Sequence, residues 1–148
     1  MDPAVKEAIL KAVADEPFTR AMGMRLVHLE EGHSVVEMTY RPERMANIYG
    51  RAHGGAVFAL IDEAFETSSQ TEGTIAVALN VNVTYVSGPE AETRLRAESR
   101  RIAETRKTAT YDIRIADDAD RTIALCQALA YRTGRPIPFL RDKEDPPS

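Results

Sequence analysis

The first seventeen residues carry apolar side chains at the spacing of a helix. Asp2 followed by Pro3 is typical of a helix start, because the carboxylate caps free N–H groups and proline fits the first helical position. Pro17 is expected to end the segment. We therefore predict a short amphipathic helix that packs on the rest of the protein, with these apolar positions: Val5, Ala8, Ile9, Ala12 and Val13.

Two strands and a longer helix are predicted next. Residues 24–30 and 34–40 read as strands joined by a turn at Glu30-Glu31-Gly32. Residues 41–55 are irregular, and from about Gly55 to Gln70 the pattern becomes helical. Residues 56–61 are apolar on every side, which indicates a helix buried on most faces.

The second half of the chain alternates between apolar and polar residues, which is the period of a strand. The alternation is strongest over residues 75–85 and is broken by Ser87-Gly88-Pro89. Three more strands are predicted over 93–102, 107–116 and 122–132, with a turn at residues 117–120 before the last.

This order of elements favours an α+β fold. Helices and strands are segregated along the chain, which is typical of an antiparallel sheet that packs on one central helix. We expect a single domain over residues 1–148, with a core at about 20–132. The proline-containing, highly charged segment 135–148 is predicted to be flexible.

Composition narrows the possible partners. A formal net charge of −4 and a pI near 5.4 argue against nucleic-acid binding, which requires a basic surface. The single cysteine, Cys126, lies in an apolar stretch and is interpreted as a small buried side chain rather than a nucleophile. No membrane span and no signal peptide are recognised, so we expect a cytoplasmic protein.

The segment from Asn47 to Asp62 contains the most informative residues of the chain. Gly54 and Gly55 precede the predicted buried helix, where backbone N–H groups are free and the helix dipole favours negative charge. His53 and Asn47 add side-chain donors. Together these groups are suited to form an oxyanion hole, which stabilises a carbonyl oxygen that gains charge in acyl transfer.

Asp62 lies in the apolar part of the same helix. A carboxylate there is costly to bury unless it is used, although Asp62 could equally face solvent beside Glu63 and Glu66. His53 likewise has a purely structural alternative, in which it holds the preceding loop. Gly54 and Asp62 are separated by about 12 Å along a helix axis, too far for both to act on one carbon. A two-fold dimer with antiparallel helices would bring Asp62 of one chain beside Gly54 of the other.

The other two histidines, His28 and His33, fall on or beside predicted strands. We find no cysteine or acidic residue near them at the spacing typical of metal ligands. They are therefore interpreted as surface or edge residues, and no metal site is predicted.

The pattern Asn47-x5-His53-Gly54-Gly55-x6-Asp62 resembles the phenylacetyl-CoA (PaaI-like) thioesterase family of the hotdog superfamily. The resemblance covers about residues 20–132 and extends to the long alternating strand that ends before Ser-Gly-Pro. It implies a central helix wrapped by a curved antiparallel sheet. It also implies hydrolysis of an acyl-CoA without a metal or a bound organic cofactor, in homodimers that usually pair into homotetramers.

The resemblance also implies roles for individual residues. Asp62 corresponds to the catalytic acid, acting as a base on water or as a nucleophile. Gly54 corresponds to the residue whose N–H polarises the thioester carbonyl. Asn47 matches the asparagine that positions water or substrate, and His53 matches the adjacent histidine. In this family the aspartate and the glycine come from opposite subunits.

We further predict that five residues contribute to substrate binding, the last two by contacting the CoA phosphates: Gly55, Asn80, Ser87, Arg106 and Lys107. An aryl- or phenylacetyl-CoA is one candidate substrate. Two alternatives are a hotdog hydratase or dehydratase that uses His53 with Asp62, and a non-catalytic acyl-CoA-binding module.

Overall fold

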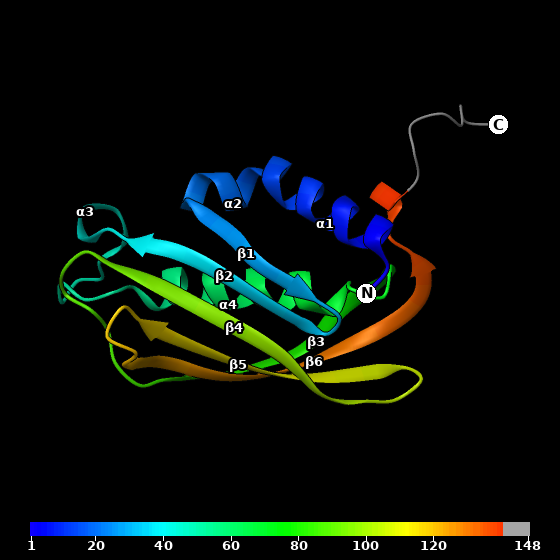
Figure 1. Ribbon diagram of the computed structural model, residues 1–148. Coiled ribbons are helices and arrows are strands. Elements are labelled where there is room, and N and C mark those ends of the chain that lie inside the picture. The colour runs from blue at the N-terminus through cyan, green and yellow to red at the C-terminus, as the bar shows by residue number, and fades with distance from the viewer. Residues whose placement is uncertain (141–148) are drawn as a thin grey trace.

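The computed structural model describes residues 1–140, and the segment 141–148 lies outside the described residues. Its main layer is a six-stranded antiparallel sheet that curves around one long helix, as Figure 1 shows. The strands follow the order β1-β2-β4-β5-β6-β3 across the sheet. Their bounds are Met24–Glu30 for β1, His33–Tyr40 for β2, Thr74–Tyr85 for β3, Thr93–Glu104 for β4, Thr108–Asp117 for β5 and Thr122–Pro136 for β6. The predicted α+β hotdog fold is confirmed.

The helical elements are α1 (Pro3–Asp15), α2 (Pro17–Met22), α3 (Pro42–Met45), α4 (Gly54–Ser69) and the short 3-10 helix η1 (Pro138–Leu140). The sequence pattern predicted α1 and α4 but not α2, α3 or η1. Pro17 ends α1, as expected, but it also begins α2, because proline fits the first turn of a helix. Within the described residues, no helix is long and apolar enough to cross a membrane.

Helix α4 is the centre of the core. It packs against β2, β4 and β5, and its aliphatic side chains are nearly all buried. The buried hydroxyl of Ser34 on β2 donates to the Ala64 carbonyl on α4 at 2.7 Å. One narrow stripe of the helix stays exposed, at one residue per turn: Gly55, Phe58, Asp62 and Glu66.

Strand β3 lies at one edge of the sheet, where it pairs only with β6. None of its twelve residues is buried, although the alternating pattern is among the strongest in the sequence. The large apolar side chains of Val77, Leu79 and Tyr85 are about half exposed. This edge is therefore an apolar surface with a row of unpaired backbone groups, which is the kind of edge that pairs with another strand.

The first part of the predicted flexible tail is ordered. Strand β6 continues to Pro136, and Ile137 is fully buried in a cluster with Val5, Ile9 and Val13 of α1. The expectation of a flexible segment from residue 135 is therefore wrong for residues 135–140, because one apolar side chain anchors them. The remainder of the predicted tail lies outside the described residues.

Cys126 is buried on β6, as its apolar surroundings predicted. Burial raises the pKa of its thiol to about 11, so the thiol is protonated at neutral pH. This excludes a ready thiolate nucleophile at this position.

Candidate active site

The loop before α4 is shaped by Asn47. Its side-chain Oδ1 accepts hydrogen bonds from the backbone N–H groups of Tyr49 (2.9 Å) and Arg51 (3.1 Å). Its backbone N–H donates to the Arg51 carbonyl at 2.7 Å. Asn47 therefore closes a tight loop that exposes Ile48 at its tip, and its amide nitrogen has no partner among residues 1–140.

His53 caps the N-terminus of α4. Its Nδ1 accepts a hydrogen bond from the Gly55 N–H at 2.9 Å, so its proton resides on Nε2. This bond occupies the Gly55 N–H, which we predicted to bind substrate. The Gly54 N–H has no acceptor among the described residues, and it therefore remains the donor available at this positive end of the helix dipole.

Tyr85, at the end of β3, packs against Gly54 and was not singled out by the sequence. Its hydroxyl donates to the Gly54 carbonyl at 3.2 Å. A Cβ added at Gly54 would lie 3.3 Å from the Cζ of Tyr85, so glycine permits this close approach. The two residues are 31 positions apart, and only the packing of β3 beside α4 brings them together.

Asp62 lies two turns further along α4, on the exposed stripe that also carries Phe58 and Glu66. The partial burial of its carboxyl raises its pKa, and the negative charge of Glu16 raises it further. Because Asp62 and Gly54 are about 12 Å apart along the axis, one chain does not bring them together. The exposed stripe leaves Asp62 accessible to a second chain.

Glu63 differs from its neighbour, because it points into the protein and is only 3% exposed. The hydroxyl of Thr19 on α2 lies 2.9 Å from Glu63 Oε2 and 3.0 Å from Glu16 Oε2. Burial, followed by the charge of Glu16, raises the pKa of Glu63 to about 7. The alternative interpretation, in which Asp62 faces solvent beside Glu63 and Glu66, therefore agrees with the structure for Asp62 and Glu66, which are exposed. It is wrong for Glu63, which is buried and faces α2.

A cleft of about 530 Å³ opens between α2, the end of β2 and the start of α4. His53 and Gly55, on either side of Gly54, are part of its wall. Its other walls combine apolar and basic side chains, among them Phe18, Met22, Met45, Arg20, Arg41 and Arg44.

The arginines of the cleft are not equivalent. Arg41 is paired with Glu92 at 3.2 Å, whereas Arg20 and Arg44 form no ion pair within the described part of the chain. The sequence reasoning missed these residues, although the frequency of arginine in residues 41–51 is a signal of a basic surface beside the motif.

The remaining predicted residues lie elsewhere. Asn80 is exposed on β3 next to a bulge, and the Ser87 hydroxyl donates to the Thr122 carbonyl at 2.8 Å. Arg106 and Lys107 are exposed in the turn between β4 and β5, where the Lys107 amine lies 5.5 Å from the centre of the Tyr131 ring. That turn is at the end of the sheet away from the start of α4 (Figure 1), so a single chain does not join this pair to the cleft.

Comparisons with known proteins place this chain in a family. The model of the thioesterase superfamily matches residues 49–124. The acyl-coenzyme A thioesterase PaaI of Escherichia coli is 30% identical over 118 residues, which cover 80% of this chain and 84% of that protein.

Two solved structures have the same architecture. The E. coli PaaI protein from the phenylacetic acid degradation operon superimposes with a TM-score of 0.85 at 27% identity, over 90% of this chain and 96% of that one. A mutant of the phenylacetic acid degradation protein PaaI from Thermus thermophilus has a TM-score of 0.74 at 33% identity, over 79% and 99% of the two chains.

The fold and these matches define a hotdog-fold thioester hydrolase. The chain belongs to the thioesterase superfamily and, within it, is PaaI-like, as the motif from Asn47 to Asp62 predicted.

Proposed function

We propose that this protein hydrolyses an acyl-CoA to the free acid and CoA. The observation that carries the proposal is the free Gly54 N–H at the start of α4, flanked by two residues that line a cleft with apolar and basic walls. Such a donor stabilises the oxyanion that forms when a thioester carbonyl is attacked. The similarity to an acyl-coenzyme A thioesterase of E. coli supports the same substrate class.

Asp62 supplies the second part of the chemistry. As a general base, its carboxylate takes a proton from water while the water oxygen forms a bond to the thioester carbon. The resulting oxyanion collapses, the carbon–sulfur bond breaks, and the thiolate of CoA leaves and takes up a proton. As a nucleophile, the carboxylate oxygen itself forms the new bond to the thioester carbon, and the carbon–sulfur bond breaks to release the CoA thiolate, which takes up a proton. Water then hydrolyses the mixed anhydride to the free acid and the Asp62 carboxylate. Asn47 and His53 hold the loop and the helix start that present the Gly54 N–H.

The complete site requires two chains, because Gly54 and Asp62 are far apart on one helix. We infer a two-fold dimer in which the exposed stripe of α4 faces that of the partner and the exposed edge of β3 pairs with its equivalent. The exposed apolar side chains of β3 and of the loop tip at Ile48 and Tyr49 would be covered by such a contact.

The cleft suggests how the two ends of the substrate are bound. Phe18, Met22 and Met45 offer an apolar surface for the acyl group, and an aryl or phenylacetyl group fits this chemistry. Arg20 and Arg44, which lack carboxylate partners in residues 1–140, are suited to bind phosphate. Arg106 and Lys107 remain predicted phosphate contacts, but only for a site to which a second chain contributes.

A hydratase or dehydratase is less compatible with His53. Its Nδ1 is occupied by the Gly55 N–H and its Nε2 carries the proton, so the imidazole has no free lone pair with which to abstract a proton.

Release of free thiol from a panel of aryl-, short- and long-chain acyl-CoAs, measured with a thiol reagent, tests the proposal. We expect steady turnover of at least one class. A hydratase would change the acyl chain without releasing thiol, and a binding module would release none beyond the uncatalysed rate. Either result would refute the proposed reaction.

A further inference from the structure

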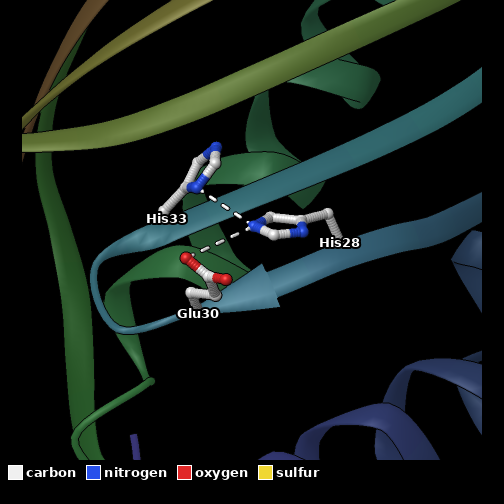
Figure 2. Close-up of side chains that lie close together, drawn as sticks. All are labelled: His28, Glu30 and His33. Atoms are coloured by element: carbon white, nitrogen blue, oxygen red, sulfur yellow. Dashed lines mark hydrogen bonds and ion pairs between the residues drawn. The ribbon is translucent and has the colours of Figure 1, made fainter.

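His28, Glu30 and His33 converge at the end of the β1–β2 hairpin, as Figure 2 shows. His28 Nε2 lies 3.2 Å from His33 Nδ1 and 3.7 Å from Glu30 Oε2. The candidate ligand atoms of all three residues lie within 4.8 Å of one another. The sequence-based expectation that no acidic residue stands at metal-ligand spacing from the two histidines is therefore wrong for Glu30.

A β-bulge in β1 produces this arrangement. The register shifts between Leu26 and His28, so His28 pairs with Val35 rather than with Ser34. Leu29 is buried on the inner face, whereas His28 and Glu30 lie on the outer face. His33, which pairs with Glu30, becomes the diagonal neighbour of His28 across the hairpin. Bulges commonly re-aim a side chain in this way.

Glu98 on β4 orients one of the two rings. Its Oε1 lies 2.9 Å from His33 Nε2. Glu98 Oε1 is also paired with the Arg100 guanidinium, so Glu98 is a carboxylate and can only accept. His33 therefore carries its proton on Nε2 and directs the lone pair of Nδ1 toward His28.

The separations match those required by a single metal ion. Tetrahedral zinc with bonds of about 2.0–2.1 Å places two ligand nitrogens about 3.3 Å apart. The two imidazole nitrogens are already 3.2 Å apart, which is close to the separation that one tetrahedral zinc ion requires. The Glu30 side chain is 67% exposed and can rotate to close its longer distance. A carboxylate that accepts from the distal nitrogen of a histidine ligand is a recurrent feature of zinc sites.

We propose that His28 Nε2, His33 Nδ1 and a Glu30 oxygen bind one divalent transition-metal ion such as Zn²⁺, with water at the fourth position. Glu98 is a positioning residue, which fixes the tautomer of His33. Imidazole ligands select zinc, nickel or copper over magnesium and calcium, which prefer oxygen.

The bound ion would clamp the sheet edge at β1. It would join β1 to β2 directly and to β4 through Glu98. The hairpin turn is also held by Thr71, in the turn that follows the C-terminal end of α4, because the Gly32 N–H donates to the Thr71 hydroxyl at 2.8 Å. Metal binding is therefore expected to raise the melting temperature, since a ligand that binds only the folded state stabilises it.

Calorimetric titration of untagged, chelator-treated protein with ZnCl₂ tests the proposal, with MgCl₂ as the comparison. We expect one zinc ion per chain and no comparable binding of magnesium. His28→Ala and His33→Ala should each abolish this binding, and Glu98→Gln should weaken it by roughly 10- to 100-fold. The matched control is Glu31→Gln, which removes a neighbouring turn carboxylate that is paired with Arg101 instead.

The three histidines of the chain allow a second, independent readout. In long-range ¹H–¹⁵N spectra of the intact protein, zinc should shift the imidazole nitrogens of His28 and His33 and leave those of His53 unchanged. This measurement needs no variant. Absence of zinc binding would overturn the proposal, and so would zinc binding that shifts only His53 or that survives both alanine substitutions. In those cases His28 and His33 would be joined only by a hydrogen bond and would bind no metal ion.

Discussion

Two adjacent carboxylates on α4 have opposite environments. Asp62 lies on the exposed stripe and faces away from the core, whereas Glu63 is buried beside Thr19. Neighbouring side chains on a helix are separated by a rotation of about 100°, so Asp62 can point to the surface while Glu63 points into the interior. These two acids should therefore respond differently to substitution.

Asp62→Ala is expected to reduce thioester hydrolysis by about 10²-fold or more, the usual cost of losing an essential acid or base. The melting temperature should change little, because the side chain is exposed. The measurement is the rate of thiol release from the best acyl-CoA of the panel. Glu66→Gln is the matched control, since Glu66 lies one turn further along the same stripe. If Asp62→Ala kept more than about a tenth of the activity, Asp62 would have no central role.

Glu63→Gln is expected to alter how stability depends on pH. Folding raises the pKa of Glu63 from 4.5 to about 7, so the folded state binds more protons than the unfolded state between these values. The contribution of Glu63 to stability is therefore full below pH 4.5 and is lost as the pH rises through about 7. Glutamine cannot ionise, so the variant does not lose this stability as the pH rises.

Urea unfolding of both proteins at about pH 5 and about pH 8 measures the difference. The variant should gain stability relative to wild type between the two pH values, by an amount on the order of 1–3 kcal/mol. Parallel stability curves for the two proteins would show that Glu63 does not titrate in this range.

At the scale of elements, the N-terminus of α4 and the edge strand β3 jointly define the candidate oxyanion donor. The His53 cap fixes the first turn, and Tyr85 packs against Gly54 from β3. Neither element alone would hold the Gly54 N–H in place. A substitution that removes only this N–H is therefore the sharpest test of its role.

Gly54→Pro removes the donor at a position where proline is tolerated in a helix. The preceding residue, His53, already has the extended conformation that proline requires, with φ −65° and ψ 134°. We expect kcat to fall by about 10²–10³-fold, the cost of losing one oxyanion donor.

Gly54→Ala is the matched control, because it keeps the N–H but adds the same Cβ at 3.3 Å from Tyr85. It separates the loss of the donor from crowding against the tyrosine ring. Equal losses in both variants would assign the effect to crowding and remove the N–H from the mechanism.

At the scale of the whole molecule, we propose an active site that two chains share. The Gly54 N–H lies at the start of α4, and the Asp62 carboxylate lies two turns further along the same helix. The exposed stripe of α4 and the β3 edge are both uncovered in the single chain. A dimer would therefore complete the site and cover the exposed apolar side chains of β3 in one step.

Mixing two inactive variants tests this arrangement. Gly54→Pro and Asp62→Ala chains are unfolded and refolded together, and thiol release is measured. About half of the dimers should be mixed, and each should contain one intact site, so activity should recover to roughly a quarter of wild type. Wild-type protein refolded alone provides the control. A mixture as inactive as its parents would contradict a shared site.

The sequence by itself determined the local elements and the motif. The cap at Asp2, the apolar run of residues 56–61 and the alternation of 75–85 are signals between near neighbours, and each predicted its element to within a few residues. The spacing from Asn47 to Asp62 likewise identified the family, because a helix start, a glycine pair and a carboxylate are read along one continuous segment.

The tertiary structure alone decided which distant residues meet. Strand order placed β3 at an edge, a bulge turned His28 toward His33, and the packing of α2 on α4 buried Glu63 beside Thr19. Each of these depends on pairing register or helix packing between segments far apart in the chain. Local periodicity does not encode such contacts, because they are selected by how all the elements bury their apolar faces together.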